Sequence, residues 1–303
     1  MKFYRSGFAS KSVRRVAEYL SPFILNVVKY VFSEMEYVPQ GWNAVKGWND
    51  QSVADAQEQH WPTLVRNLQG PGPLGVSHLP WHITRDDRAD HNIIMSYGYV
   101  LALAARKKDV LSILDWGGGV GHYYLYSKAL LPEVGIEYHC YDVPNLCRLG
   151  RKLLPEIHSH DDERDLLGRQ YDVVVSSSSL HYFEDWRDQV RKLAAATRGF
   201  LYVSRLQVVN CVPSFVVVHK VLRAGYTEFL SWCINRQEFL SCAEECGLEL
   251  VREFVFTEQW TIRGAPEKAE CRGFLFRQQT IPEGDRRRIG PAGRVQQHSF
   301  GIS

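Results

Sequence analysis

The sequence lacks a strong excess of either charge, because 36 Lys and Arg residues stand against 34 Asp and Glu residues in a chain of 303. Proteins that bind nucleic acids carry a strongly basic surface, so the net charge of +2 gives no reason to expect a nucleic-acid partner. Apolar residues make up 45% and charged residues 23%, which excludes a disordered charged chain and a collagen-like repeat. The length corresponds to one or two domains of about 150 residues each.

A cysteine framework is also missing. The seven cysteines are scattered from Cys140 to Cys271 without a C-x-x-C pair. Only Cys242 and Cys246 have a helix-like spacing, and without His or Cys partners they are expected to pack as small apolar residues rather than to bind a metal. An odd number of scattered thiols is typical of a reducing compartment, not of a disulfide-bonded secreted protein.

The sequence begins without the features of a signal peptide or a membrane-spanning helix. Lys2 and Arg5 are followed by polar residues, and no small-residue cleavage site comes after them. Asn26 and Lys29 interrupt the only long apolar stretch, whereas a spanning helix needs about 20 apolar residues. We therefore expect a cytoplasmic protein.

Residues 12–34 have apolar side chains every three or four positions, which predicts amphipathic helix. Within residues 1–35, six basic residues face two acidic ones, so this segment is basic although the whole chain is nearly neutral. A basic amphipathic helix can lie peripherally on an anionic membrane, here the inner membrane. The same pattern suits a helix that covers the main domain or contacts a second copy, and the sequence leaves these alternatives open.

Residues 36–89 are expected to form a helical cap and a linker ahead of the main domain. A helix is predicted over residues 50–68. Residues 69–75 then contain two prolines and three glycines, which interrupt regular structure. A second helix with a charged start is predicted over residues 85–105.

Residues 90–278 alternate between strand-like and helix-like segments, which predicts an α/β fold with a mostly parallel sheet and helices on both faces. The last two strands have no obvious helix between them and are expected to form an antiparallel hairpin. Residues 279–303 are poor in apolar residues and are expected to be a flexible tail. The main strands are predicted at residues 111–115, 137–142, 171–176, 199–204, 248–257 and 272–277.

The strongest motif follows the first of these strands, where an acidic residue is succeeded by glycines at alternate positions. Asp115 ends the strand, and Gly117, Gly119 and Gly121 follow it. Glycine permits positive φ angles and lets backbone amides approach a ligand, while the next helix directs its N-terminus toward it. The segment therefore predicts a binding loop for a nucleotide-like ligand.

A dinucleotide is disfavoured as that ligand. Dinucleotide-binding loops follow the pattern G-x-G-x-x-G, in which the last glycine lets the helix pack on the strand. Counting from Gly117 puts His122 at the last position, and counting from Gly119 puts Tyr124 there. An NAD-dependent oxidoreductase is therefore disfavoured as well.

The D-x-G-x-G-x-G pattern instead resembles motif I of the class I S-adenosylmethionine-dependent methyltransferases, and all seven positions match. This resemblance implies a seven-stranded, Rossmann-like sheet with S-adenosylmethionine as cofactor. It also implies that Asp142, after the second strand, binds the ribose hydroxyls, since a carboxylate can accept two hydrogen bonds from a diol. The residues implied to bind the cofactor at the loop are Asp115, Gly117, Gly118, Gly119 and Gly121.

Further cofactor contacts are implied by the same resemblance. Val143 would flank the adenine, and either Asp161 or Asp162 would bind the adenine amino group after a third strand at about residues 157–159. Ser176 and Ser177 end the fourth strand, where ligands bind in open α/β sheets. Arg85 would contact the cofactor carboxylate from the preceding helix.

Over residues 36–278 the chain resembles a bacterial family of methyltransferases associated with polysaccharide and cell-surface glycan genes. In one respect it departs from that family, because Ser204 replaces the acidic residue expected before the arginine of the fifth strand. The other segments that carry the resemblance are Gly41-Trp42, Arg85-Asp86, the glycine loop, Ser204-Arg205, Tyr226, Trp232 and residues 273–276.

Methyl transfer requires alignment of the acceptor with the methyl group and often removal of a proton. His181, expected at the start of the helix after the fourth strand, is the candidate base because imidazole titrates near neutral pH; alternatively it packs at the helix start. Arg205 would hold an anionic group of the acceptor, or form a structural ion pair. The tryptophans Trp42, Trp61 and Trp232 would stack on a sugar or belong to the core.

The sequence therefore predicts a methyltransferase that acts on an oxygen of a sugar or another polar small metabolite. The alternative is a non-catalytic relative that serves as an interaction module through its basic N-terminal helix. An intact acidic residue, glycine loop and Asp142 favour the enzyme, since a degenerate copy need not keep them.

Overall fold

The computed structural model describes residues 35–39, 41–42, 47–77, 85–166, 168–220, 228–258 and 260–279. The basic helix predicted over residues 12–34 lies outside the described residues, as do Tyr226 and the predicted tail beyond Gln279. The predicted domain boundaries accordingly stay predictions. No helix among the described residues is long and apolar enough to cross a membrane.

The central part of the sheet consists of five parallel strands in the order β6-β5-β2-β3-β4. Strands that are covered on both faces have continuous apolar runs, and Val173, Val174 and Val175 of β5 are fully buried. This confirms the α/β fold with a mostly parallel sheet. The five strands are β2 (Val110–Trp116), β3 (Gly135–Tyr141), β4 (His158–His160), β5 (Tyr171–Ser177) and β6 (Thr197–Val209).

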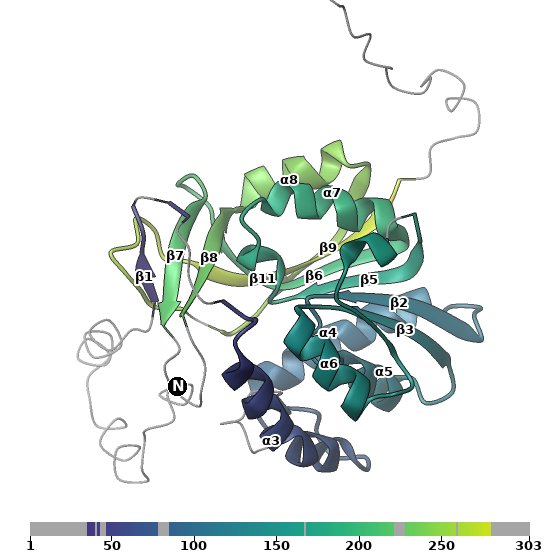
Figure 1. Cartoon of the computed structure of the whole chain (residues 1–303). Coiled ribbons are helices and arrows are strands. Elements are labelled where there is room, and N and C mark those ends of the chain that lie inside the picture. The colour runs from purple at the N-terminus through teal and green to yellow at the C-terminus, as the bar shows by residue number, and fades with distance from the viewer. Residues whose placement is uncertain are drawn as a thin grey trace, which may run out of the picture.

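Helices cover both faces of this sheet (Figure 1): α7 and α8 lie on one face, and α4, α5 and α6 lie on the other. The two helices predicted before the sheet are confirmed, and carboxylates start both. Asp50 accepts from the backbone N–H of Ser52, and Asp87 accepts from those of Ala89 and Asp90. The helices are α3 (Gln51–Leu68), α4 (Arg88–Ala104), α5 (His122–Leu130), α6 (Pro144–Leu153), α7 (Trp186–Ala196) and α8 (Arg236–Glu245).

The sheet continues beyond β6 into a second group of strands, in the order β10-β1-β7-β8-β6. The described residues form eleven strands, so the expected count of seven is too low. The insertion after the fifth strand supplies β7 and β8, which pair antiparallel, and β8 joins the end of β6 at Val208 and Val209. The added strands are β1 (Met35–Tyr37), β7 (Phe215–Lys220), β8 (Glu228–Asn235) and β10 (Ile262–Arg263).

The expected C-terminal hairpin is not confirmed in its simple form. The strands β9 (Leu248–Val255) and β11 (Glu270–Gln278) do pair antiparallel. However, the residues between them include β10, which pairs with β1 at the far edge of the sheet. β11 also pairs along β6. The chain therefore crosses to the added strands and returns before the pair closes.

Strand β6 changes partner at a β-bulge. It pairs with β5 as far as Ser204 and with β8 from Val208 onward. On its other side, a register shift places Gly273 of β11 opposite both Ser204 and Arg205. Arg205 has a φ of +55°, which is unfavourable for a residue with a side chain. The bulge re-aims the Arg205 side chain at the point where the two groups of strands meet.

Two 3₁₀ turns complete the elements, namely η1 (Glu163–Asp165) and η2 (Leu180–Tyr182). The helix expected to begin at His181 instead begins at Trp186, because the Asp185 carboxylate accepts from the backbone N–H of Asp188 and caps α7 there. His181 lies in η2. All seven cysteines are free thiols, as the sequence predicted.

Candidate active site

The glycine loop between β2 and α5 has the left-handed conformation that its spacing predicts. Gly117, Gly119 and Gly121 have φ angles of +73°, +63° and +89°, which L-residues with side chains rarely adopt. Close packing adds a second requirement at Gly117, where a β-carbon would lie 2.3 Å from the Ser179 Cβ. The backbone of this loop is therefore held in one shape at the carboxyl end of β2.

Asp115 supports the loop from inside the protein. Its side chain is buried, and the Tyr138 hydroxyl donates a 2.6 Å hydrogen bond to Oδ2. A β-carbon on Gly118 would lie 2.3 Å from the same Oδ2. Burial raises the pKa of Asp115 to about 7, and the Tyr138 hydrogen bond only partly opposes this. These contacts hold the strand end and the loop together, and a direct contact of Asp115 with a cofactor stays a prediction.

Asp142 follows β3 and closes the loop. Its Oδ2 accepts from the Gly119 backbone N–H at 2.7 Å, and its Oδ1 accepts from the Val143 backbone N–H at 2.7 Å. Burial raises the pKa of Asp142 to about 6. A carboxylate has about four acceptor positions, so two remain for a diol. The donor set and the closely packed glycine loop therefore fit the adenosyl part of S-adenosylmethionine.

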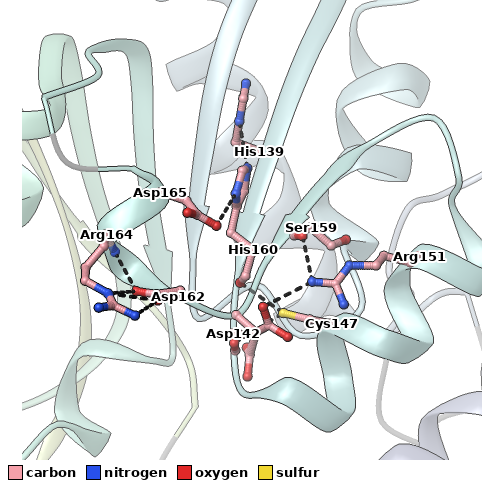
Figure 2. A network of polar contacts seen from close by, with 10 residues as sticks. His139, Asp142, Cys147, Arg151, Ser159, His160, Asp162, Arg164 and Asp165 are labelled. Carbon is pink, nitrogen blue, oxygen red and sulfur yellow. Dashed lines mark hydrogen bonds and ion pairs between the residues drawn. The ribbon is translucent and has the colours of Figure 1, made fainter.

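A pair of acidic residues, Asp161 and Asp162, follows β4 (Figure 2). Asp161 pairs with Arg151, with Nη2 and Oδ1 3.2 Å apart. Asp162 caps η1, where its carboxylate accepts from both the backbone N–H and Nε of Arg164 at 2.9 Å. The choice between Asp161 and Asp162 at an adenine stays open, although the Asp162 carboxylate is already more fully engaged.

Figure 2 also shows how this end of the sheet is tied to Asp142. The Cys147 thiol of α6 contacts the backbone oxygens of Asp142 and His160, at 3.2 and 3.1 Å. The Asp142 backbone N–H donates to the same His160 oxygen at 3.2 Å. The position of the Asp142 carboxylate is thus fixed by β4 and α6 as well as by the glycine loop.

Ser176 and Ser177 end β5, as predicted, and have different partners. Ser176 is buried, and its hydroxyl shares a 2.7 Å hydrogen bond with that of Ser179. Ser177 shares a 2.6 Å bond with the Tyr123 hydroxyl of α5 and accepts from the Ser204 hydroxyl at 2.9 Å. The structure therefore brings together the carboxyl ends of β5 and β6 and the first turn of α5.

Arg85 lies against the Gly/Pro run that precedes it. Its Nε donates to the Pro73 oxygen at 3.1 Å, and its Nη1 donates to the Gln69 oxygen at 3.2 Å. Its Nη2 is buried without a hydrogen-bond partner among the described residues. A contact between Arg85 and a cofactor carboxylate stays a prediction, and these bonds assign the side chain a structural contact with the turn.

His181 is almost completely buried, with 1% of its surface exposed. Neither of its ring nitrogens has a hydrogen-bond partner among the described residues. Burial lowers the pKa of His181 to about 3, and the positive charge of Arg205 acts in the same direction. The ring is therefore neutral at physiological pH and is a weak base in this environment.

Arg205 forms a structural ion pair, one of the two alternatives that the sequence offered for it, with a partner that the sequence did not identify. Its Nε and Nη2 donate to the two carboxylate oxygens of Glu258, each at 3.2 Å. Burial opposes the charge of Arg205, but attraction to Glu258 outweighs it and raises the pKa of the guanidinium. Because Glu258 lies far along the chain in a segment without a motif, no local sequence signal identifies it. The Cys271 thiol also contacts the Glu258 carboxylate, at 3.4 Å.

Aromatic rings from the segment before α3 pack against β8 and η2. Trp48 stacks on Phe229 of β8 with centroids 4.0 Å apart, and it meets Tyr182 of η2 edge-on at 5.1 Å. Trp42 and Trp232 stack on each other at 6.1 Å. The third tryptophan considered for sugar stacking, Trp61, lies in the core. Stacking of Trp42 or Trp232 on a sugar stays a prediction.

Comparisons with known proteins agree with this geometry. Residues 94–253 match the family model described as a methyltransferase domain, which covers more than half of the chain. No functionally curated protein matches.

Three methyltransferases are among the solved structures to which the chain shows similarity. The S-adenosylmethionine-dependent methyltransferase from Clostridium acetobutylicum is 9% identical, with a TM-score of 0.43 over 62% of this chain and 92% of that chain. An S-adenosylmethionine-dependent methyltransferase from Methanosarcina mazei is 15% identical, with a TM-score of 0.44 over 57% of this chain and 95% of that chain. The CcbJ methyltransferase from Streptomyces caelestis is 16% identical, with a TM-score of 0.42 over 60% of this chain and 90% of that chain.

The predicted cofactor, S-adenosylmethionine, agrees with the family match and with the loop geometry. On the strength of the match over residues 94–253, the chain belongs to the methyltransferase-domain family.

Proposed function

We propose that this protein is an S-adenosylmethionine-dependent methyltransferase that methylates an oxygen atom of a sugar or another polar small molecule. The observation that carries the proposal is the closure of the glycine loop on Asp142 through the 2.7 Å bond from the Gly119 N–H. When bound, the cofactor would supply a methyl group on a positively charged sulfur.

The residues proposed to hold the cofactor lie along the carboxyl ends of the parallel strands. The Gly117–Gly121 backbone and Asp142 would bind its adenosyl part, with Val143 beside the adenine and Asp161 or Asp162 at the amino group. Ser176, Ser177 and Arg85 are proposed as further contacts. The support is positional, since ligands of open α/β sheets bind at this edge.

For the acceptor, we propose that His181 and Arg205 orient the reacting group. His181 has two ring nitrogens without partners among the described residues. The lowered pKa makes its ring a weak base, so orientation through the neutral ring is better supported than proton removal. The Glu258 pair neutralises Arg205, which weakens the prediction that Arg205 holds an anionic group.

The proposed biological setting is polysaccharide or cell-surface glycan synthesis, which would provide sugar hydroxyls as acceptors; its support is the family resemblance. The cytoplasm is the proposed location, with residues 12–34 in contact with the inner membrane or a second copy, and its support is the sequence pattern. Identification of the acceptor tests the setting.

Isothermal titration calorimetry of the purified chain with S-adenosylhomocysteine and, separately, with NAD tests the proposal. We expect heat of binding with S-adenosylhomocysteine and none with NAD; the reverse result would reject the methyltransferase. Radiolabelled methyl transfer then separates the enzyme from a non-catalytic relative, which would bind S-adenosylhomocysteine but transfer no label to any small acceptor.

A further inference from the structure

Two buried side chains on neighbouring elements have polar atoms without partners. They are His181 of η2, through Nδ1 and Nε2, and Ser231 of β8, through Oγ. Ser231 is completely buried. Among the described residues, none supplies these three atoms with a hydrogen bond. Buried polar atoms without partners destabilise a protein, so a bound molecule that satisfies them is the physical explanation to test.

The two side chains come from elements that pack against each other, η2 and β8. In the β7–β8 pair, Ser231 lies opposite Val217 and Phe229 lies opposite His219, so these four side chains share one side of the added strands. Phe229 contacts Tyr182 of η2, with centroids 6.1 Å apart, and His181 is the preceding residue of η2. We call His181, His219, Phe229 and Ser231 the β8–η2 face.

The charges near this face cancel. Arg205 and Glu258 are the charged groups that act on His181, and they pair with each other through two hydrogen bonds. A positive charge on His219 would also lower the pKa of His181, and burial lowers the pKa of His219 to about 4. Both imidazoles are therefore neutral near pH 7. A neutral imidazole offers one donor and one acceptor, and a serine hydroxyl offers both.

We infer that the β8–η2 face binds the methyl acceptor, and that the acceptor presents uncharged hydroxyl groups rather than a carboxylate or a phosphate. This inference rests on the proposed methyl transfer and adds to it a location and a substrate class. A hydroxyl can donate to one ring nitrogen and accept from another group at once. An anion would bring a charge for which the described residues of this face offer no unpaired cation.

The first experiment compares two buried serines without any ligand. We expect Ser231→Ala to leave the melting temperature unchanged or to raise it, because the change removes a hydroxyl without a partner. Ser127→Ala is the matched control, because the Ser127 hydroxyl is bonded to the Tyr97 hydroxyl at 2.7 Å and to the Tyr123 oxygen at 2.8 Å. We expect this control to lower the melting temperature by about 2–4 °C. An equal fall for Ser231→Ala would overturn the inference.

The second experiment measures transfer of a radiolabelled methyl group to three probes that share a sugar ring. The neutral probe is methyl α-D-glucopyranoside, and the anionic probes are D-glucuronate and D-glucose 6-phosphate. We expect label only in the neutral probe, and we expect Ser231→Ala to raise its KM by about tenfold while the Kd of S-adenosylhomocysteine stays unchanged.

Three results would reject the inference in a protein that binds S-adenosylhomocysteine. They are methylation of an anionic probe at equal or higher kcat/KM, an unchanged KM in Ser231→Ala, and no methylation of the neutral probe. A failure to bind S-adenosylhomocysteine would instead reject the proposed function itself, so the two failures are distinguishable.

Discussion

The glycine loop and the β8–η2 face differ in whether their buried polar side chains have hydrogen-bond partners within the described part of the chain. At the loop, the carboxylates are already bonded, Asp115 to Tyr138 and Asp142 to two backbone N–H groups. At the β8–η2 face, His181 and Ser231 have no hydrogen-bond partners among the described residues. The proposed cofactor side therefore has its buried carboxylates bonded within the chain, whereas the proposed acceptor side would take its hydrogen bonds from a ligand.

The largest expected effect is on stability at the acceptor side. Glu258→Gln should lower the free energy of unfolding by about 3–5 kcal/mol, because it leaves the buried charge of Arg205 without its partner. Urea denaturation measures this loss. The control is Glu249→Gln, which breaks the exposed pair with Arg277 and should cost at most about 1 kcal/mol. Equal losses in the two variants would mean that the buried pair does not stabilise this region.

The next largest effect is on cofactor binding. Asp142→Asn should weaken the affinity for S-adenosylhomocysteine by about 10- to 100-fold, because a charged acceptor of the ribose hydroxyls is lost. Calorimetry measures the change. Asp188→Asn on the exposed side of α7 serves as the control, and its affinity should match that of the unmodified chain. If Asp142→Asn bound equally well, the ribose assignment would be wrong.

The pH dependence of the same affinity should be smaller. A diol binds the ionised carboxylate, and burial raises the pKa of Asp142 to about 6. Affinity for S-adenosylhomocysteine should therefore rise from pH 5 to pH 7, by up to about tenfold per pH unit below the pKa. Asp115 titrates in the same range, so Asp142→Asn is needed to separate the two groups. A pH profile that is as steep in Asp142→Asn would assign the dependence to Asp115.

The raised pKa values have an opposite consequence for folding. The folded carboxyls of Asp115 and Asp142 hold protons more tightly than the unfolded ones, whose pKa is 3.8. The stability that these two groups contribute should therefore fall as pH rises from about 4 to about 7 in the protein without ligand. Thermal unfolding across this range measures the trend, and Asp142→Asn should reduce it.

The smallest effect separates the two acidic residues after β4. Asp161→Asn should weaken binding of S-adenosylhomocysteine about two- to fivefold. Asp162→Asn should leave it unchanged, because its carboxylate is already held by Arg164. A larger loss in Asp162→Asn would assign the adenine contact to that residue instead.

The two regions also differ in how far the sequence predicted them. The glycine loop, Asp142 and the strand before each were predicted because their contacts are local or follow a fixed strand-loop-helix spacing. The added strands were not predicted, since β6 was expected to end at Ser204, before the charged Arg205. The strand instead continues to Val209, and the charge of Arg205 is paired inside the protein with Glu258, which is distant in sequence.

The sequence of the insertion after β6 does contain a local signal for two of the added strands. The segment at Phe215–Val218 and the alternation from Phe229 to Ile234 are typical of strands. The surroundings of His181 were not predictable in the same way. They depend on which residues of β6 and β8 pack against η2, and this register is set by long-range pairing rather than by any local spacing.

The shared strand β6 limits how the added strands can move relative to the central parallel strands. One continuous strand pairs with β5 on the cofactor side and with β8 on the acceptor side, and β11 runs along it across the junction. A swing of the added strands about Arg205 would break the backbone hydrogen bonds that join β6 to β11 across this point. Under the proposed function, the acceptor would therefore enter by rearrangement of connecting loops and side chains, and the β6 backbone would hold the two proposed binding regions in place.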